Sequence, residues 1–163
     1  MSSKKVATYG MLIALAFIFS YVEMLIPFHF GIPGMKLGLA NIVVIAALYS
    51  MGYKEAVFLS ILRIFLVGFT FGNMYGILYS LAGGIMSYLV MVICKRTKLF
   101  SIIGVSVAGG VSHNIGQILV AMWVLDTSTL VYYLPVLFIS GAVTGVLIGI
   151  LGGSITKRIN MKS

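Results

Sequence analysis

The chain alternates between long apolar segments and short breaks of polar, charged or turn-forming residues. The breaks include Pro27, "GIPG" at 31–34, Gly52 and "KRTK" at 95–98. About 20 apolar residues are needed to cross a membrane as a helix. We therefore predict an all-α integral membrane protein, a single domain over residues 1–163 with six transmembrane helices. The expected spans are 6–26, 37–51, 56–71, 74–94, 102–125 and 131–153, of which the second and third are short and should be tilted or shielded by neighbours.

The amino-acid composition supports an integral membrane protein and argues against a soluble or a disulfide-rich protein. Only 9% of the residues are charged, whereas soluble proteins average about 25%. The single cysteine, Cys94, excludes a disulfide framework. The first apolar stretch runs on to Ile26 without a clear cleavage site, so we interpret it as an uncleaved first helix and not as a signal peptide.

The basic residues predict the orientation. Six spans place both termini and the turns near Lys54 and at 95–98 on one side, and nine of the eleven Lys and Arg residues lie there. The opposite side has only Lys36, while Arg63 lies inside a span. Because cytoplasmic loops are enriched in Lys and Arg, we expect both termini in the cytoplasm of a bacterial cell, with the chain in the plasma membrane. The net charge of +8 is then explained by the orientation of the chain in the membrane. We therefore expect no nucleic-acid partner.

The densest polar cluster lies in the middle of an apolar segment, "VSHNIGQIL" at 111–119. At about 100° per residue, Ser106, Gly110, His113 and Gln117 fall on one stripe, with Asn114 at its edge. Polar groups in hydrocarbon must pair or line a wet cavity, so this stripe should face the protein interior. Two interpretations stay open: the side chains hold neighbouring helices together, or they bind a ligand.

Other polar residues gather with this stripe in the outer half of the predicted bundle. Arg63 has three possible roles: its side chain reaches the cytoplasmic surface, it pairs with Glu23, or it holds an anionic ligand. Lys36 is either a solvated loop residue or a contact for an anion at the mouth of a site. The predicted substrate-binding residues are Lys36, Asn41, Arg63, Asn73, Tyr79, His113, Asn114 and Gln117.

Small residues recur at helical spacing in two places. Gly141, Gly145, Gly149 and Gly153 form a ladder in the last span, for which we expect close packing inside the bundle. Ala7, Gly10 and Ala14 form a similar face on the first span, which serves either internal packing or docking of another membrane protein.

The sequence lacks the residues that several kinds of chemistry require. The three acidic residues, Glu23, Glu55 and Asp126, are far apart, so no paired-aspartate motif can hold a diphosphate through magnesium. There is no phosphate-binding loop for ATP, and two histidines without thiol or acidic companions make a zinc site improbable. We therefore predict no enzyme, no cofactor and no metal site.

Four stretches resemble a known family: "PGMKLGLANIVVIAALYSMGYKEA" (33–56), "ILRIFLVGFTFGNMYGILYSLAGG" (61–84), "VSHNIGQILVA" (111–121) and "YYLPVLFISGAVTGVLIG" (132–149). They are similar to the Gx transporter family, whose members are often labelled heptaprenyl diphosphate synthase component I. The layout also resembles the substrate-binding S components of energy-coupling factor (ECF) importers. That resemblance implies six helices, an outer loop that gates the site, and a small-residue face on the first helix that docks a coupling subunit. Ala7, Gly10 and Ala14 match that face loosely.

These observations lead to one expected function and its alternatives. We expect an S-component-like subunit that captures a small anionic or aromatic metabolite, such as a vitamin, a flavin or an isoprenoid or quinone precursor, from outside. Its expected partners are membrane lipid, that small-molecule substrate, and a coupling transmembrane subunit with two ATPases. The alternative is a non-catalytic membrane subunit of a polyprenyl diphosphate, quinone or flavin-linked system, and a third possibility is an assembly protein whose polar stripe only joins helices.

Overall fold

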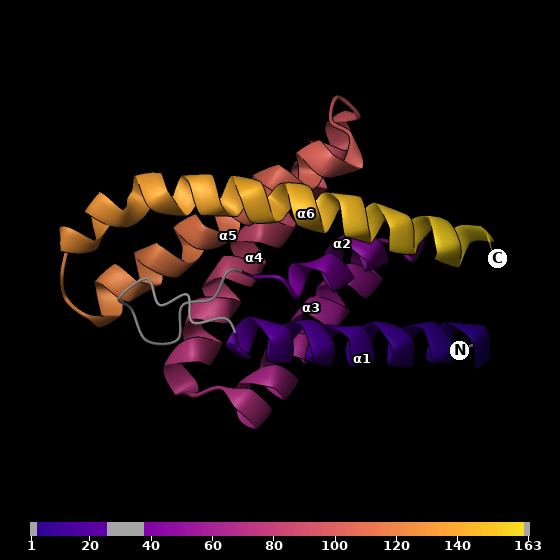
Figure 1. Ribbon diagram of the computed structural model, residues 1–163, viewed down its shortest axis with the longest axis horizontal. Coiled ribbons are helices and arrows are strands. Elements are labelled where there is room, and N and C mark those ends of the chain that lie inside the picture. Colours follow the sequence, from indigo (N-terminus) through magenta and orange to yellow (C-terminus); the bar gives the residue numbers. More distant parts are fainter. Residues whose placement is uncertain (1–2, 26–37, 162–163) are drawn as a thin grey trace.

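The computed structural model describes residues 3–25 and 38–161, and within these ranges the regular structure is entirely helical (Figure 1). Ala40 and Gly52 immediately precede the second and third helices, and Asn73 and Ser101 cap the fourth and fifth with their side chains. The elements are α1 (Ser3–Leu25), α2 (Asn41–Ser50), α3 (Tyr53–Phe71), α4 (Met74–Thr97), α5 (Ile102–Val124), the 3₁₀ turn η1 (Thr129–Tyr133) and α6 (Leu134–Met161).

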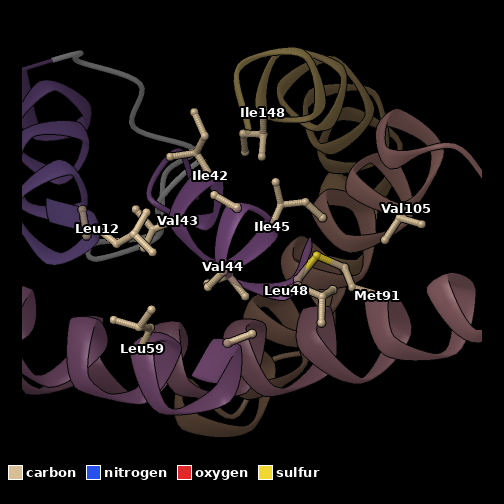
Figure 2. Packing of buried hydrophobic residues seen from close by; sticks show 14 residues of the cluster. Leu12, Ile42, Val43, Val44, Ile45, Leu48, Leu59, Met91, Val105 and Ile148 are labelled. Carbon is tan, nitrogen blue, oxygen red and sulfur yellow. The ribbon is translucent and has the colours of Figure 1, made fainter. Parts of the chain in front are cut away.

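The short helix α2 forms the centre of the bundle. Its residues from Asn41 to Leu48 are all buried, and Leu12 of α1, Leu59 of α3 and Ile148 of α6 belong to the same hydrophobic cluster (Figure 2). Ten residues of α-helix are about 15 Å long, half the thickness of the hydrocarbon core. Helix α2 is therefore a core element enclosed by its neighbours, and by itself it does not span a membrane.

Four of the described helices are long and apolar enough to cross a membrane. They cover Lys5–Leu25, Met74–Thr97, Ile102–Val124 and Thr129–Ile159. Helix α3 is long enough, but it carries three charged residues, Lys54, Glu55 and Arg63. The all-α membrane class is thus supported, whereas the predicted count of six spans is not confirmed, because the segment 37–51 contributes only the buried helix α2.

Helices α5 and α6 pack with their backbones almost in contact. A Cβ atom added at Gly145 would lie 2.6 Å from Cα of Val107, and one added at Gly149 would lie 2.7 Å from Cα of Ile103. Gly141 likewise meets the backbone of Gly110 and Val111. The predicted packing role of the glycine ladder is confirmed for these three positions. At Gly153 an added Cβ would meet only the Ile102 side chain, at 3.5 Å.

Basic side chains fasten the end of the bundle at which both termini lie (Figure 1). Lys5 of α1 forms an ion pair with Glu55 of α3 at 2.7 Å. Lys95 of α4 donates to the carbonyl oxygen of Leu48 at the end of α2, and its ammonium lies 4.5 Å from the centre of the Tyr49 ring. We call this the basic end; that it faces the cytoplasm remains a prediction from the charge distribution.

Candidate functional site

The polar stripe of α5 faces the interior, as its spacing predicted. His113 and Asn114 are each 2% exposed and Gln117 is completely buried, while Leu119 on the other side of the helix is 49% exposed. Ser106 and Gly110 are buried on the same face. The stripe divides into two parts, because its side chains meet different helices.

Asn114 belongs to the contact between α5 and α6. Its amide nitrogen donates to the carbonyl oxygen of Leu137 at 2.8 Å and lies 3.2 Å from the hydroxyl of Ser140. Both partners lie on α6, close to the glycine ladder. Asn114 therefore joins two helices, which is the first of the two interpretations that the sequence left open.

His113 and Gln117 face the other way, toward α4. The amide nitrogen of Gln117 lies 3.0 Å from Nε2 of His113, one helical turn away. A Cβ added at Gly83 of α4 would lie 2.9 Å from both side chains, so the glycine makes room for them. The Oε1 atom of Gln117 is buried without a hydrogen-bond partner among the described residues. An unpaired buried oxygen costs about 1–3 kcal/mol of stability. Gln117 therefore differs from Asn114, whose amide nitrogen bonds to the neighbouring helix.

Arg63 of α3 reaches the same region from the opposite side. It is 7% exposed, and its Nη2 atom donates to Oδ1 of Asn41, the first residue of α2, at 3.0 Å. Because Lys95 holds the other end of α2, Arg63 points away from the basic end. In this geometry the Arg63 side chain does not reach the basic end, so it reaches the cytoplasmic surface only if the predicted orientation is reversed. Its Nε atom is buried and has no partner within the described part of the chain.

Glu23 and Gly38 complete the cluster, and neither was in the predicted binding set. A carboxylate oxygen of Glu23 in α1 accepts the backbone N–H of Gly38. Gly38 has a φ of 82°, a conformation suited to glycine. A Cβ at Gly38 would lie 3.1 Å from Nδ2 of Asn41 and from Cδ2 of His113. Glu23 and Arg63 line the same pocket, and the pairing considered from the sequence stays a prediction.

These side chains surround a small polar pocket. Helices α1, α3, α4 and α5 all contribute to its wall, and its volume is about 20 Å³. That is room for a water molecule or the head group of a ligand, and not for an entire vitamin. Gly68, Gly72 and Gly76 also line the pocket, on the α3 and α4 side. Its polar lining residues are Ser20, Glu23, Arg63, Ser80 and His113.

The remaining members of the predicted set lie elsewhere. Asn73 is exposed and caps α4 by accepting the backbone N–H of Gly76 at 2.8 Å. Tyr79 is 2% exposed in a hydrophobic cluster with Ile118 and Leu137. Lys36 lies outside the described residues. The structure thus brings Arg63 and His113 to the pocket, with Asn41 and Gln117 bonded directly behind them.

The family model for heptaprenyl diphosphate synthase component I matches residues 12–155, which is most of the chain. The chain belongs to this family. No curated protein and no solved structure matches it. Within the heptaprenyl diphosphate synthase component I match lie all the polar residues of the pocket. The family assignment therefore covers the part of the chain that forms the pocket.

The small-residue face of α1 points out of the bundle. Ala7, Gly10 and Ala14 are all exposed, and a Cβ added at Gly10 would meet nothing within 4 Å. Packing inside the described bundle is therefore not the role of this face. The match to heptaprenyl diphosphate synthase component I begins at residue 12, so it includes only Ala14 of the three.

Among the described residues no group of three His, Cys, Asp or Glu side chains is placed to hold a metal ion. Lys5 and Glu55 form an ion pair at the basic end, and neither of them lines the pocket. What the pocket offers is a guanidinium group, an imidazole, a carboxylate and hydroxyls, with the amides of Asn41 and Gln117 directly behind the first two. Such groups bind and orient a polar ligand.

Proposed function

We propose that the chain is the substrate-binding membrane subunit of an ECF-type importer, which captures a small metabolite from outside the cell. The observation that carries the proposal is the buried polar pocket to which four helices contribute. Polar side chains at such depth are costly unless they have a function or a partner. Three of the groups in or beside this pocket, Nε of Arg63, Nδ1 of His113 and Oε1 of Gln117, have no hydrogen-bond partner in the described part of the chain.

The location of the pocket fits loading from outside. It lies where α1 ends and α2 begins, away from the end fastened by Lys5 and Lys95. If the basic end is cytoplasmic, the pocket lies in the outer half of a plasma-membrane protein. Asn41 and Gln117 would hold Arg63 and His113 in place for the ligand, and Lys36 would add a positive charge at the entrance.

Import would also require a partner that supplies energy. The chain has no phosphate-binding loop for ATP, so a coupling transmembrane subunit and two ATPases would have to supply it. The face formed by Ala7, Gly10 and Ala14 supports such a contact, because it is exposed and small residues allow close approach of another helix.

Native mass spectrometry of the purified full chain tests the proposal. We expect a retained small metabolite, with its affinity reduced in His113→Ala and in Lys36→Ala. Ser154→Ala, which changes an exposed hydroxyl on α6, is the matched control and should bind as the unchanged chain does. Unchanged affinity in both of the first two variants would overturn the assignment of the site.

The family description favours a second candidate. A protein described as component I of a synthase would be the non-catalytic membrane partner of a prenyl-chain enzyme. In that case the acidic residues Glu23, Glu55 and Asp126 would take no part in chemistry, since they are far apart in the sequence. Co-purification separates the two candidates: ATPases and a coupling subunit support import, whereas a prenyl diphosphate synthase supports the second.

A further inference from the structure

We propose that the protein binds the head group of an anionic phospholipid where α4 ends, at the turn that leads to α5. The site is a basic patch formed by Lys54 of α3 together with Arg96 and Lys98, beside the exposed side chains of Leu99 and Phe100. This inference does not depend on import of a metabolite, because it concerns how the protein is held in its bilayer.

The cations of the basic patch carry uncompensated charge. Lys54, Arg96 and Lys98 are all exposed, and none of them forms an ion pair within the described part of the chain. Glu55, the acidic residue next to Lys54, is bound by Lys5 at 2.7 Å instead. Each Lys or Arg close to an anionic lipid surface strengthens attachment about fivefold. The patch therefore favours anionic over zwitterionic lipid.

Tyr53, the first residue of α3, brings the two parts of the patch together. The guanidinium carbon of Arg96 lies 5.4 Å from the centre of the Tyr53 ring, so the end of α4 lies beside the start of α3, where Lys54 follows. Tyr53 is itself held, because its carbonyl oxygen accepts the hydroxyl of Tyr88 at 2.9 Å. Lys98 has a φ of 58° and forms the C-cap of α4. The fold thus fixes the backbone that carries all three cations.

Two apolar side chains distinguish a phospholipid from a soluble anion. Leu99 and Phe100 directly follow the cations, and they are 82% and 51% exposed. Surfaces that bind to the membrane interface combine basic and large apolar side chains in this way. A phospholipid satisfies both kinds of residue, since its phosphate meets the cations and its acyl chains cover the apolar side chains. A free phosphate would leave Leu99 and Phe100 in water.

The far end of α5 lacks this combination and provides an internal control. Trp123, the only tryptophan of the chain, is 80% exposed there. It lies about 30 Å along the helix from the patch, and the charged residue closest to it in the sequence is the acidic Asp126. Trp123 therefore contacts lipid without a cation that would select the anionic kind.

Tryptophan quenching by brominated lipids in nanodiscs tests the proposal on the full chain. In the reporter variant, Trp123→Phe with Phe100→Trp, the single tryptophan lies at the patch, whereas in the unchanged chain it lies at the far end. The probes are brominated phosphatidylglycerol and brominated phosphatidylcholine with the same acyl chains. We expect the reporter at position 100 to prefer the anionic lipid at least fivefold, and Trp123 to show no preference.

Two double variants of the reporter chain locate the effect. Arg96→Gln with Lys98→Gln should bring the preference close to one, because the cations beside the reporter are lost. Lys157→Gln with Arg158→Gln removes the same charge from exposed positions on α6 and should leave the preference unchanged. All the substituted side chains are exposed, and equal unfolding midpoints would confirm that the variants fold.

Four results would overturn the proposal. Equal quenching of the reporter by both lipids would show that the patch does not select the anionic head group. An equal loss of preference in the two double variants would mean that net charge attracts the lipid without a site. Displacement of the lipid by soluble glycerol phosphate would assign the patch to a free anion. The absence of quenching by either lipid would place water or an acidic partner protein at the turn.

Discussion

The two sides of α5 use polar residues in opposite ways. On the side of α6, Asn114 donates to two acceptors, and glycines bring the helix backbones together. On the side of α3 and α4, His113 and Gln117 bond to each other, and Oε1 of Gln117 has no described partner. The first arrangement closes a helix interface, while the second leaves hydrogen-bonding capacity beside a pocket.

The difference shows that helix joining and ligand binding are not exclusive interpretations of one polar stripe. Asn114 and Gln117 are three residues apart and equally hidden from solvent. Burial alone therefore does not separate the two roles. The hydrogen-bond partners separate the two roles. Asn114 bonds to a neighbouring helix, whereas Gln117 bonds within its own helix to His113, which lines the pocket.

The largest effect is expected where the α6 side is most tightly packed. In Gly145→Ala the new Cβ would lie 2.6 Å from Cα of Val107, so the helices must separate, and we expect a loss of about 1–3 kcal/mol of stability. Gly153→Ala is the matched control, because its Cβ meets only a side chain at 3.5 Å. It should be neutral or gain up to about 1 kcal/mol from helix propensity. Thermal unfolding in detergent measures both, and equal midpoints would contradict the close packing.

Asn114→Leu tests whether this residue joins helices only. The substitution keeps the branched shape of the side chain, with bulkier methyl groups in place of the amide, and removes the bonds to Leu137 and Ser140, so we expect a loss of about 1–2 kcal/mol. Retention of the metabolite should not change. Ser140→Ala removes one of the two partners and should cost less. A fall in ligand affinity without a fall in the unfolding midpoint would place Asn114 in the binding site after all.

Asn73→Ala tests a polar residue that belongs to neither side of α5. Its side chain accepts the N–H of Gly76 at the start of α4, and loss of such a cap typically costs about 1 kcal/mol. We expect a modest drop in the unfolding midpoint and full ligand retention. Asn73→Ser, which can still cap the helix, should restore stability. If Asn73→Ser lost the ligand, the sequence-based assignment of Asn73 to the site would be correct.

The inward stripe of α5 and the glycine ladder of α6 could be predicted from the sequence, because both follow from the geometry of a single helix. The shortness of the segment 37–51 left two expectations open for it, tilting or shielding by neighbours, and the structure shows that α2 is enclosed. An aliphatic segment such as 41–48 has the same composition whether lipid or other helices surround it, so length was the only signal, and the predicted span 37–51 proved to contain a helix of ten residues.

The pocket was only partly predictable, because its members come together through tertiary contacts. Arg63 and His113 stood out as polar residues inside apolar segments. Glu23 stood out for the same reason, yet its bond to Gly38 depends on how α1 and α2 meet. Asn73 could have been recognised as a cap, since an asparagine just before a helical run is a start signal.

Gln117→Met is expected to have the smallest effect on stability. It tests most directly whether the side of α5 that faces α3 and α4 binds a ligand or only joins helices. The substitution removes one hydrogen bond to His113 and also removes an unpaired buried oxygen, and these two contributions nearly cancel. His113 loses the partner that orients it, so ligand affinity should fall about fivefold, the worth of one hydrogen bond. Unfolding midpoints and native mass spectrometry on the same samples measure the two effects. If Gln117→Met destabilised the protein more than Asn114→Leu and left the affinity unchanged, both sides of α5 would be helix interfaces, and the pocket would hold only water.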